Sequence, residues 1–484
     1  MSDQARYVLA IDQGTSATKA LMLDSSGEIV SRGEAPLTEL HSANGFVEQD
    51  PYLVEESIRQ AVKRATENFS LSKIRAIGIS NQRESVVLWD KNTQAAVSSI
   101  VSWQDSRAAQ ICENLRSAGL DMRIQELSGL PLDPMFSAAK ISWLLDYYDA
   151  DRSKSRSGKL AVGTIDSWLT RSTGNHSIEI GNASRTQLLD IHNGEWSQEL
   201  LEAFNIPIEL MPEVRSSTFK SSLHGEDDLG KIPILSILGD SHSALFGHGI
   251  HMPGIAKVTY GTGSSIMTLT ESIPVKQVGI ARTIAWKTSQ GISYALEGNI
   301  RSAGSTLKWV SQITGKSVEE LSSLAVTAAD DSLQIIPAFN GLAAPWWDSS
   351  VRGVVTGLAF NSGPAEFARA AINAVALQVR DVIRAMNDCG AGIKIIEADG
   401  GASLNNYLMQ LQSDLLNLPV HRAQSSDFSA LGTAYLAGIE AGLWNTSDWE
   451  NHATKVFAPQ NQDTTSLLHA WENSLLLARS YSPR

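Results

Sequence analysis

The strongest constraint on the fold is a pattern that occurs twice, once in each half of the chain. Near the N-terminus two apolar segments, YVLAID (7–12) and KALMLD (19–24), flank the polar stretch QGTSAT. In the second half, AKVTY (256–260) and IMTLT (266–270) flank GTGSS. Short apolar runs bounded by glycine, serine and threonine are typical of strands joined by a tight turn. The sequence therefore predicts two similar β-hairpins and a chain built from two related halves.

Helical segments alternate with the predicted strands. Asp50 followed by Pro51 has the form of a helix cap with proline at the first helical position, and apolar residues then recur at helical spacing. A second helical pattern begins at Pro364 and is followed by an apolar strand at 393–398. Strands that alternate with helices favour an α/β fold, here in two lobes.

The length of 484 residues is enough for two large domains or about three of ordinary size. The repeated hairpin favours two, and the Pro253–Gly254 pair lies between the two halves. We therefore expect an N-terminal domain at 1–248 and a C-terminal domain at 249–484.

Charge and cysteine content exclude several classes of partner. Lys and Arg total 39 against 52 Asp and Glu, so the formal net charge of −13 repels a phosphate backbone and predicts no nucleic-acid partner. No apolar run reaches the roughly 18 residues of a membrane helix, which predicts no membrane insertion. Because Cys112 and Cys389 are too few for a disulfide framework, we expect the chain in the reducing cytoplasm.

The turns of the two predicted hairpins are candidates for phosphate binding. Tight turns such as GTS (14–16) and GTGSS (261–265) can aim several backbone N–H groups at one anion, with hydroxyl side chains beside them. Asp12, at the end of the first strand, is placed to hold a hydrated Mg²⁺ near these phosphates, and Lys19 to offset their charge. A single such turn is more often a structural bend, so the phosphate interpretation depends on finding two at corresponding places.

A carboxylate follows another apolar strand. Asp240 comes directly after the segment at 232–238, beside Gly239 and Ser241, and carboxylates at strand ends lie where α/β clefts bind ligands. An alcohol that attacks phosphorus must lose its proton, which a nearby aspartate can accept. The alternative is that Asp240 only caps a helix that begins near Ser241.

Three further places combine polar or aromatic residues with the end of an apolar segment. Arg83 and Glu84, in the loop NQRE (81–84), can bind the hydroxyls of a polyol, although a solvated turn explains the same residues. Trp103 could pack on the C–H face of a small polyol, although a core tryptophan is an equal alternative. The glycines at 400–401 let backbone approach adenosine or phosphate, or form an ordinary strand-to-helix turn.

The order of these motifs along the chain is that of a known family. The motifs are AIDQGTS (10–16), SNQRES (80–85), GLPLDP (129–134), FSAAKISWLLD (136–146), NASRTQLLDI (182–191), GDSHSALFG (239–247), YGTGSS (260–265), YALEGNI (294–300), IPAFNGLAAPWWD (336–348) and ADGGASLNNYLMQLQSDLL (398–416). On these residues the chain resembles the FGGY carbohydrate kinases, and among them the glycerol kinases most. The resemblance runs from residue 7 to residue 445 and fades in the C-terminal segment.

The resemblance implies two ribonuclease-H-like lobes of the actin and hexokinase type, with an active-site cleft between them. It also implies transfer of the γ-phosphoryl group of ATP to the terminal hydroxyl of a small polyol, with glycerol to glycerol 3-phosphate as the leading reaction. Asp240 matches the general base, and Asp12 and Asp240 the carboxylates near Mg²⁺. The nucleotide positions, counting those in the two turns, are Gly14, Thr15, Ser16, Lys19, Gly261, Thr262, Gly304, Lys308, Gly401 and Asn405.

The substrate positions follow the family only in part. The positions that match the glycerol-contacting set are Arg83, Glu84, Trp103 and Asp240. Met135 stands where the family has a tyrosine, Ser241 where it has a glutamine, and Ser265 where it has a phenylalanine. Loss of the large apolar side chain at Ser265 predicts a roomier and more polar pocket, so erythritol, threitol, xylulose and ribulose are alternative acceptors.

An alternative from another class is a nucleotide-gated binding protein on an actin-type core. The predicted polyol set of Arg83, Glu84 and Trp103 argues against it. Small kinases of this sort often dimerise, so a homodimer is an expected assembly, although periodicity locates no interface.

Overall fold

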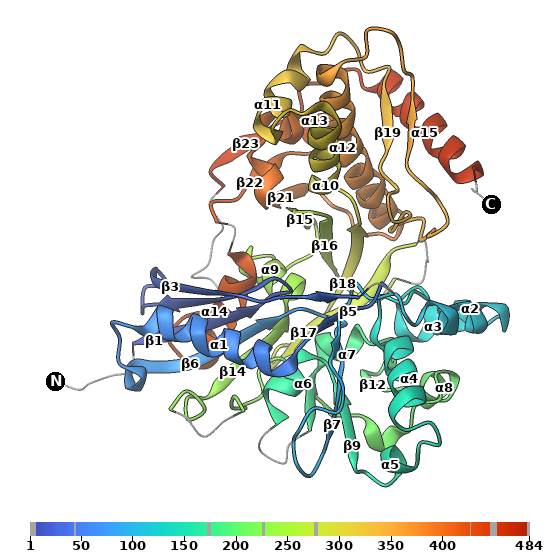
Figure 1. Cartoon of the computed structure of the whole chain (residues 1–484). Helices are drawn as coiled ribbons and strands as arrows, with labels where there is room; N and C mark the ends of the chain where they lie inside the picture. Colours follow the sequence, from blue (N-terminus) through green and yellow to red (C-terminus); the bar gives the residue numbers. More distant parts are fainter. Residues whose placement is uncertain are drawn as a thin grey trace. The chain divides into compact units, whose positions relative to one another are not determined.

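A computed structural model describes residues 6–42, 45–171, 176–224, 228–274, 279–425, 427–445 and 453–481, which form an α/β fold (Figure 1). By compactness the chain divides into two units. Unit 1 consists of Met1–Gly249, Arg282–Tyr294 and Asp427–Glu450, and unit 2 of Ile250–Ala281, Ala295–Ser426 and Asn451–Arg484. The units are therefore not contiguous in the sequence. The division into functional domains at 1–248 and 249–484 stays a prediction.

Unit 1 is built on a five-stranded mixed sheet in the order β14–β6–β1–β2–β3. β1 (Tyr7–Gln13), β2 (Ala17–Leu23) and β3 (Ile29–Pro36) form an antiparallel meander, and β6 (Ile74–Asn81) and β14 (Ile234–Gly239) are added in parallel. The first predicted hairpin is confirmed as β1 and β2, joined by the turn at 14–16. Parallel β1, β6 and β14 bring their carboxyl ends to the same edge of the sheet.

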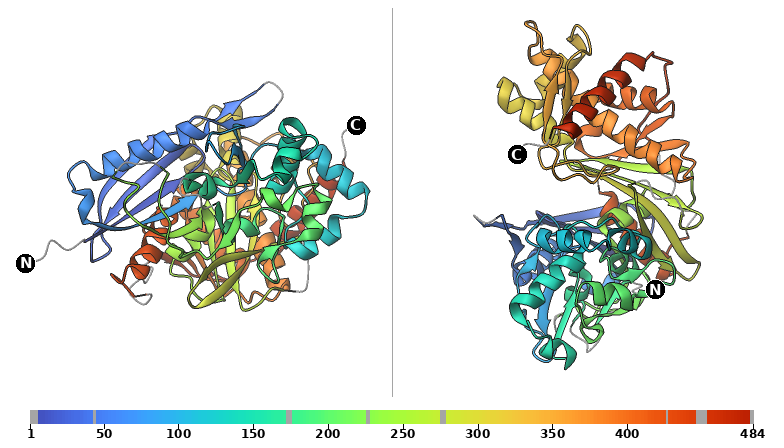
Figure 2. Two further views of the ribbon diagram at one scale, coloured as in Figure 1. Left: turned by 90° about the horizontal axis from the view of Figure 1, so that it is seen from below. Right: turned by 90° about the vertical axis from the view of Figure 1, so that its right-hand side faces the viewer.

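Two helices cover opposite faces of this sheet (Figure 2). The helix predicted after Asp50 is α1 (Pro51–Thr66), and the Asp50 side chain accepts from two N–H groups of its first turn. Ile77 and Ile79 of β6 pack with α1 in one core cluster. Gly78 between them faces α14 (Phe428–Glu440), where a Cβ would lie 2.3 Å from a backbone oxygen. Neighbouring strand residues point to opposite faces, so α14 belongs to the sheet of unit 1 although it comes late in the chain.

Unit 2 repeats the strand order of unit 1. Its strands run in the order β16–β15–β21–β22–β23, and β16 also pairs with β18, whose residues from Ala295 onward belong to unit 2. β15 (Ile255–Tyr260) and β16 (Ser264–Thr270) form the second predicted hairpin, which is therefore confirmed. β21 (Ile395–Asp399) and β22 (Val420–Arg422) are added in parallel on the other side of β15.

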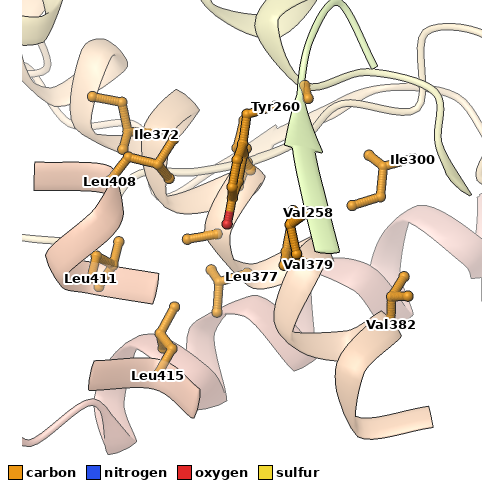
Figure 3. Close-up of a cluster of buried hydrophobic side chains, with 14 of the residues drawn as sticks. Val258, Tyr260, Ile300, Ile372, Leu377, Val379, Val382, Leu408, Leu411 and Leu415 are labelled. Carbon is orange, nitrogen blue, oxygen red and sulfur yellow. The ribbon is translucent and has the colours of Figure 1, made fainter. Parts of the chain in front are cut away.

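The core of unit 2 holds β15 against two helices, the predicted α12 (Pro364–Asp388) and α13 (Asn406–Leu416) (Figure 3). Tyr260, at the end of β15, is fully buried, and its hydroxyl donates to Gln412 of α13 at 3.0 Å. Burial raises the pKa of the Tyr260 phenol, which stays neutral. This contact fixes the point at which the glycine turn after β15 leaves the core.

The remaining helices and strands complete the two units. They are β4 (Leu40–His41), β5 (Val47–Gln49), β7 (Val87–Asp90), β8 (Ile100–Val101), α2 (Ala109–Ser117), α3 (Asp121–Ser128), α4 (Ser137–Tyr148), α5 (Ser153–Arg156), β9 (Leu160–Gly163), α6 (Ile165–Leu169), β10 (Ser177–Glu179), α7 (Ile180–Ser184), β11 (Leu189–Asp190), β12 (Glu195–Trp196), α8 (Gln198–Ala203), β13 (Glu213–Arg215), α9 (Asp240–Gly247), β17 (Ala281–Thr288), β18 (Gly291–Ile300), α10 (Gly304–Thr314), α11 (Val318–Leu324), β19 (Gln334–Ile336), β20 (Val354–Thr356), β23 (Lys455–Phe457) and α15 (Thr465–Ser480). Among the described residues, no helix combines the length and the apolar character needed to cross a membrane.

Candidate active site

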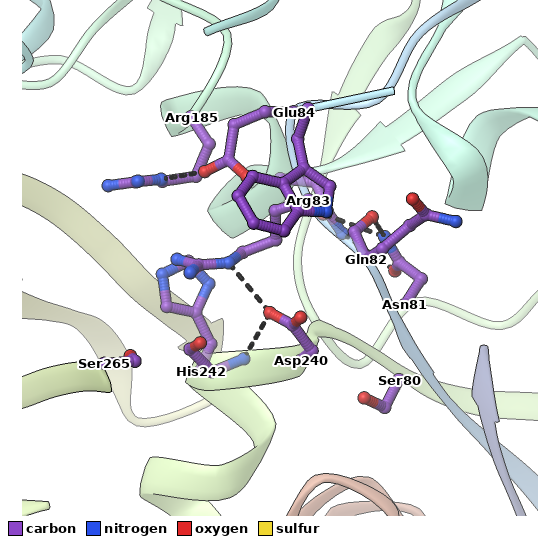
Figure 4. A network of polar contacts seen from close by, with 12 residues as sticks. Ser80, Asn81, Gln82, Arg83, Glu84, Arg185, Asp240, His242 and Ser265 are labelled. Atoms are coloured by element: carbon purple, nitrogen blue, oxygen red, sulfur yellow. Dashed lines mark hydrogen bonds and ion pairs between the residues drawn. The ribbon is translucent and has the colours of Figure 1, made fainter. Parts of the chain in front are cut away.

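The polar loop after β6, whose side chains Figure 4 draws, is buried, so the solvated-turn alternative for it is wrong. Asn81, Gln82, Arg83 and Glu84 are each at most 6% exposed. The Asn81 amide donates to Asn182 of α7 at 3.1 Å. Because β6 lies between β1 and β14, a loop that leaves its end starts inside the unit. The charged side chains of this loop are therefore held in place by the protein.

Glu84 is paired with an arginine that the sequence analysis gave no role. The Arg185 Nε donates to Glu84 Oε1 at 2.6 Å, and both side chains are buried. Glu84 has φ 62°, a left-handed conformation that a non-glycine residue adopts at a cost in energy. The Ser137 hydroxyl donates to the Glu84 carbonyl at 3.1 Å and helps to hold this conformation. The Glu84 carboxylate is therefore fixed by one oxygen, and the other can accept from a ligand hydroxyl.

Asp240 is the first residue of α9, and Gly239 is its N-cap. The Arg83 Nε donates to Asp240 Oδ1 at 3.0 Å, and the Ser241 N–H donates to the same oxygen at 2.6 Å. Both hydrogen bonds use Oδ1, so Oδ2 is available to accept a proton. The side chain is 39% exposed, which lets a substrate reach it. A Cβ at Gly239 would lie 2.4 Å from the Arg83 Cδ, so only glycine leaves room for this pair.

Asp12 lies close enough to Asp240 for their charges to interact. It accepts from the Ser80 hydroxyl at 2.9 Å. Burial raises the pKa of Asp12 to about 6, the Ser80 hydrogen bond lowers it, and the negative charge of Asp240 raises it again. Two carboxylates that repel one another favour a cation between them. In the described part of the chain no group of three or more His, Cys, Asp or Glu could hold a metal. Mg²⁺ commonly takes one or two carboxylates together with phosphate and water, so Asp12 and Asp240 fit it.

Lys19 has a partner that sequence reasoning missed. Its ammonium donates to Asp427 Oδ1 at 3.2 Å, and the Arg32 guanidinium donates to the other oxygen of the same carboxylate. Asp427 stands immediately before α14 and is brought to Lys19 only by the folding of that late helix onto β1 and β6. No local pattern marks this pair in the sequence.

The first turn is held through its carbonyl groups. The Thr15 carbonyl accepts from the Gln49 amide at 2.6 Å, and the Ser16 carbonyl accepts from the Leu37 N–H at 2.9 Å. Trp103 is 37% exposed, and its indole N–H donates to the Thr15 hydroxyl at 3.0 Å. The core alternative for Trp103 is therefore wrong. The structure places this aromatic ring beside the turn that includes Gly14, Thr15 and Ser16.

The three departures from the family pattern lie on different elements. Met135 precedes α4, its N–H donates to Asp133 at 2.9 Å, and its carbonyl accepts from the buried Lys140 ammonium. Ser241 follows Asp240 in α9. Ser265 is in β16 of unit 2. Substrate contacts of Met135, Ser241 and Ser265 stay predictions.

The predicted nucleotide residues of unit 2 meet around the second turn. The Gly304 N–H donates to the Gly261 carbonyl at 3.0 Å, and the Ala303 N–H donates to the Thr262 carbonyl at 3.0 Å. A Cβ at Gly304 would lie 2.6 Å from the Gly261 oxygen. The turn therefore lies directly against the start of α10, and exposed Lys308 stands one helical turn further along α10.

The strand-to-helix turn after β21 lies beside the same place. Gly400 has φ 87°, and a Cβ there would lie 2.6 Å from the carbonyl oxygen of Tyr260. A Cβ at Gly401 would meet nothing within 4 Å, so this position is open. Asn405 accepts from the Leu408 N–H at 3.1 Å, whereas its own Nδ2 is buried with no hydrogen-bond partner among the described residues. A free amide donor beside an open glycine turn fits the ring nitrogens of adenine, so these residues fit ATP.

Comparison with known proteins agrees with this geometry. The model of the FGGY family of carbohydrate kinases, N-terminal domain, matches residues 7–247, and the C-terminal domain model matches residues 256–441. The chain is 38% identical to a glycerol kinase of Burkholderia cenocepacia over 500 residues, with 99% of each protein covered. A glycerol kinase of Burkholderia pseudomallei is also 38% identical, again over 99% of both chains.

Solved structures give the same result. The fold matches the crystal structure of Plasmodium falciparum glycerol kinase with ADP at a TM-score of 0.89, with 28% identity and 98% of each chain covered. Xylulose kinase from Lactobacillus acidophilus matches at a TM-score of 0.87 with 22% identity over 98% of each chain, which shows the common two-domain fold of the actin and hexokinase type. The chain therefore belongs to the FGGY family of carbohydrate kinases and is an ATP-dependent kinase.

Proposed function

We propose that this chain phosphorylates glycerol at a terminal hydroxyl to give glycerol 3-phosphate. The observation that carries the proposal is the Asp240 carboxylate, which Arg83 holds by one oxygen while the other oxygen is available as a base. Glu84 beside it, fixed by Arg185, supplies an acceptor for a second hydroxyl. The 38% identity to glycerol kinases over almost the whole chain supports glycerol as the acceptor.

In the proposed mechanism Asp240 Oδ2 accepts the proton of the terminal hydroxyl as its oxygen attacks the γ-phosphorus of ATP. The new oxygen–phosphorus bond forms while the bond to the ADP oxygen breaks. Arg83 keeps the carboxylate oriented, and the Trp103 ring packs on the C–H face of the polyol. Asp12 would hold Mg²⁺, with Asp240 facing the ion through a water molecule, and the ion when bound neutralises charge on the phosphates.

Each unit is proposed to carry nucleotide-binding residues of its own. Gly14, Thr15, Ser16 and Lys19 would contact phosphate from unit 1, and Gly261, Thr262, Gly304 and Lys308 from unit 2. Gly401 and Asn405 would contact the adenosine, because Gly401 is open and Asn405 has an amide donor without a partner. Turns of this kind bind anions through backbone N–H groups.

A second candidate acceptor is a longer polyol or a ketose. Met135, Ser241 and Ser265 are all smaller or more flexible than the tyrosine, glutamine and phenylalanine that the family resemblance predicts at these positions. A site enlarged in this way favours erythritol, threitol, xylulose or ribulose. We rank glycerol first because Arg83, Glu84 and Trp103 follow the glycerol-binding pattern.

A coupled ADP-release assay with each of the five acceptors tests the proposal. We expect the highest kcat/KM with glycerol and only background hydrolysis of ATP without an acceptor. A higher kcat/KM with any other acceptor would replace glycerol as the substrate, and no acceptor-dependent release at all would reject the function.

We further propose the cytoplasm as the compartment, since Cys112 and Cys389 form no disulfide, and a homodimer as the assembly.

A further inference from the structure

A closed ring of hydrogen bonds in unit 1 begins and ends at Thr15 of the first turn. The Gln49 Nε2 donates to the Thr15 carbonyl at 2.6 Å, and the Gln82 Nε2 donates to Gln49 Oε1 at 2.9 Å. The Ser85 hydroxyl donates to Gln82 Oε1 at 2.9 Å, and the Trp103 backbone N–H donates to Ser85 Oγ at 3.1 Å. The Trp103 indole N–H closes the ring on the Thr15 hydroxyl at 3.0 Å. We call these five residues the Thr15 ring.

The ring joins two separate sheets. Gln49 ends β5, whose neighbour β8 leads directly into Trp103, and Gln49 lies opposite Ile100 in that small sheet. Thr15 and Gln82 follow β1 and β6 of the large sheet. The ring is therefore the hydrogen-bonded link between the sheet that carries Trp103 and the sheet that carries the phosphate turn.

Burial makes this link rigid. Gln49, Gln82 and Ser85 are each at most 1% exposed. Hydrogen bonds are electrostatically stronger where water is excluded, and a buried polar group that loses its partner is costly. Gln13 adds a parallel connection, because it accepts from the Gln82 amide at 3.2 Å and donates to the Gly14 carbonyl at 2.7 Å.

The side-chain amide of Gln49 both donates and accepts a hydrogen bond within the Thr15 ring. Its Nε2 donates to the phosphate turn, and its Oε1 accepts from the polyol loop. A carboxylate at this position would repel the Thr15 carbonyl, and an apolar side chain would break both bonds. Only a carboxamide of this length satisfies both neighbours.

We infer that Gln49 is a positioning residue that couples the polyol site to the phosphate turn through the Thr15 ring. The inference rests on the proposed function, in which Trp103 packs on the polyol and Thr15 contacts phosphate. A polyol seated on Trp103 then holds the turn in the position needed for transfer. With the ring broken, transfer to the polyol slows and water competes better as the acceptor.

Kinetics of Gln49→Met and Trp103→Phe, singly and combined, test the coupling. Gln49→Met keeps the length and removes both hydrogen bonds, whereas Trp103→Phe keeps an aromatic ring and removes the indole N–H. We expect each to lower kcat for the polyol roughly tenfold, about the effect of one hydrogen bond, and to raise the ratio of ATP hydrolysis to polyol phosphorylation. The double variant should lose little more than either single variant, because all act on one ring.

Gln334→Met is the matched control. Gln334 is equally buried and donates one hydrogen bond of 2.6 Å to the Asp331 carbonyl, but it lies in β19 of unit 2. We expect its kcat and its ratio of hydrolysis to phosphorylation to equal those of the wild type. Equal losses in Gln334→Met and Gln49→Met, or full additivity in the double variant, would overturn the coupling.

Hydrogen–deuterium exchange of the peptide that covers residues 13–18, without any ligand, separates this inference from the proposed function. We expect faster exchange in both Gln49→Met and Trp103→Phe than in the wild type. If deuterium exchange of this peptide is faster in both variants but the wild type phosphorylates no polyol, the structural role of the Thr15 ring is supported and the proposed function is rejected. Unchanged exchange in both variants would overturn the ring itself, whatever the activity.

Discussion

At the residue scale, the carboxylates of Asp240 and Glu84 are each paired with an arginine. Arg83 holds Asp240 and Arg185 holds Glu84. Removing one member of a buried ion pair leaves an unpaired charge, which costs about 3–5 kcal/mol. Variants that test a chemical role must therefore keep the shape and hydrogen bonds of the residue they replace.

Asn405 allows such a test of nucleotide binding. Asn405→Asp keeps the oxygen that caps α13 and removes the buried Nδ2 donor. We expect the KM for ATP to rise roughly tenfold, as for the loss of one hydrogen bond, because the Nδ2 donor is lost while the capping oxygen is kept. Asn405→Ala is the comparison, because it also loses the cap, worth about 1 kcal/mol, and should melt earlier. An unchanged KM for ATP in Asn405→Asp would remove this residue from the nucleotide site.

The buried side chain of His176 makes the stability of the folded protein depend on pH. Its Nε2 donates to the Val162 carbonyl at 2.8 Å, and burial lowers the pKa of His176 from 6.5 to about 4. The unfolded chain therefore binds a proton that the folded protein excludes, and stability is lost as pH falls from 6.5 through 4. His176→Gln keeps a donor but does not titrate. We expect the melting temperature of the wild type to fall relative to that of His176→Gln over this range, and a constant difference would contradict the assignment.

Residue roles were predictable only where a motif or a strand end marked them. Asp12 lies near the end of β1 and Asp240 directly follows β14, and the ends of parallel strands meet at one edge of a sheet. Arg185 and Asp427 carry no such mark, because an arginine or aspartate that pairs inside a fold has the same sequence appearance as one on the surface. Their partners Glu84 and Lys19 come from distant parts of the chain.

At the scale of elements, the site depends on the close contact of α9 and α14. A Cβ at Gly432 of α14 would lie 1.8 Å from the Ser243 carbonyl oxygen of α9. The two helix backbones therefore approach at this glycine, and α9 carries Asp240 at its start. The position of the proposed base is thus set by a glycine in a different helix.

Gly432→Ala tests this contact. We expect it to lower the free energy of unfolding by about 1–3 kcal/mol, the usual cost of overpacking, and to reduce kcat by displacing α9. The control is Glu440→Ala, an exposed position near the end of the same helix, which should change neither quantity. Urea titration and steady-state kinetics measure the two effects, and full stability of Gly432→Ala would contradict the close approach.

Elements with local signals were predicted well. Asp50 and Pro51 begin α1 because capping and the fixed φ of proline act within one turn. The glycine turns likewise predicted both hairpins, which the structure confirms as β1–β2 and β15–β16. The packing of Arg282–Tyr294 and α14 with unit 1 was not predicted, because it depends on contacts between segments that are far apart in the chain.

At the scale of the whole molecule, each unit has an antiparallel hairpin whose first strand also pairs with a parallel strand. This repetition places a glycine turn after the first strand of each sheet. Family membership and the reaction class then follow from the ordered motifs, which the family models match over both halves. The acceptor is the least predictable property, because it depends on a few side chains such as Met135 and Ser241.

The most direct test of the account is the turnover of Asp240→Asn at saturating glycerol and ATP. Asparagine keeps an oxygen for Arg83 and Ser241 but cannot accept the hydroxyl proton. We predict that ADP release falls by at least about a hundredfold, the effect of removing a general base, while the Kd for ATP from titration calorimetry stays within about threefold. Turnover close to that of the wild type would contradict the role of Asp240 and with it the proposed mechanism.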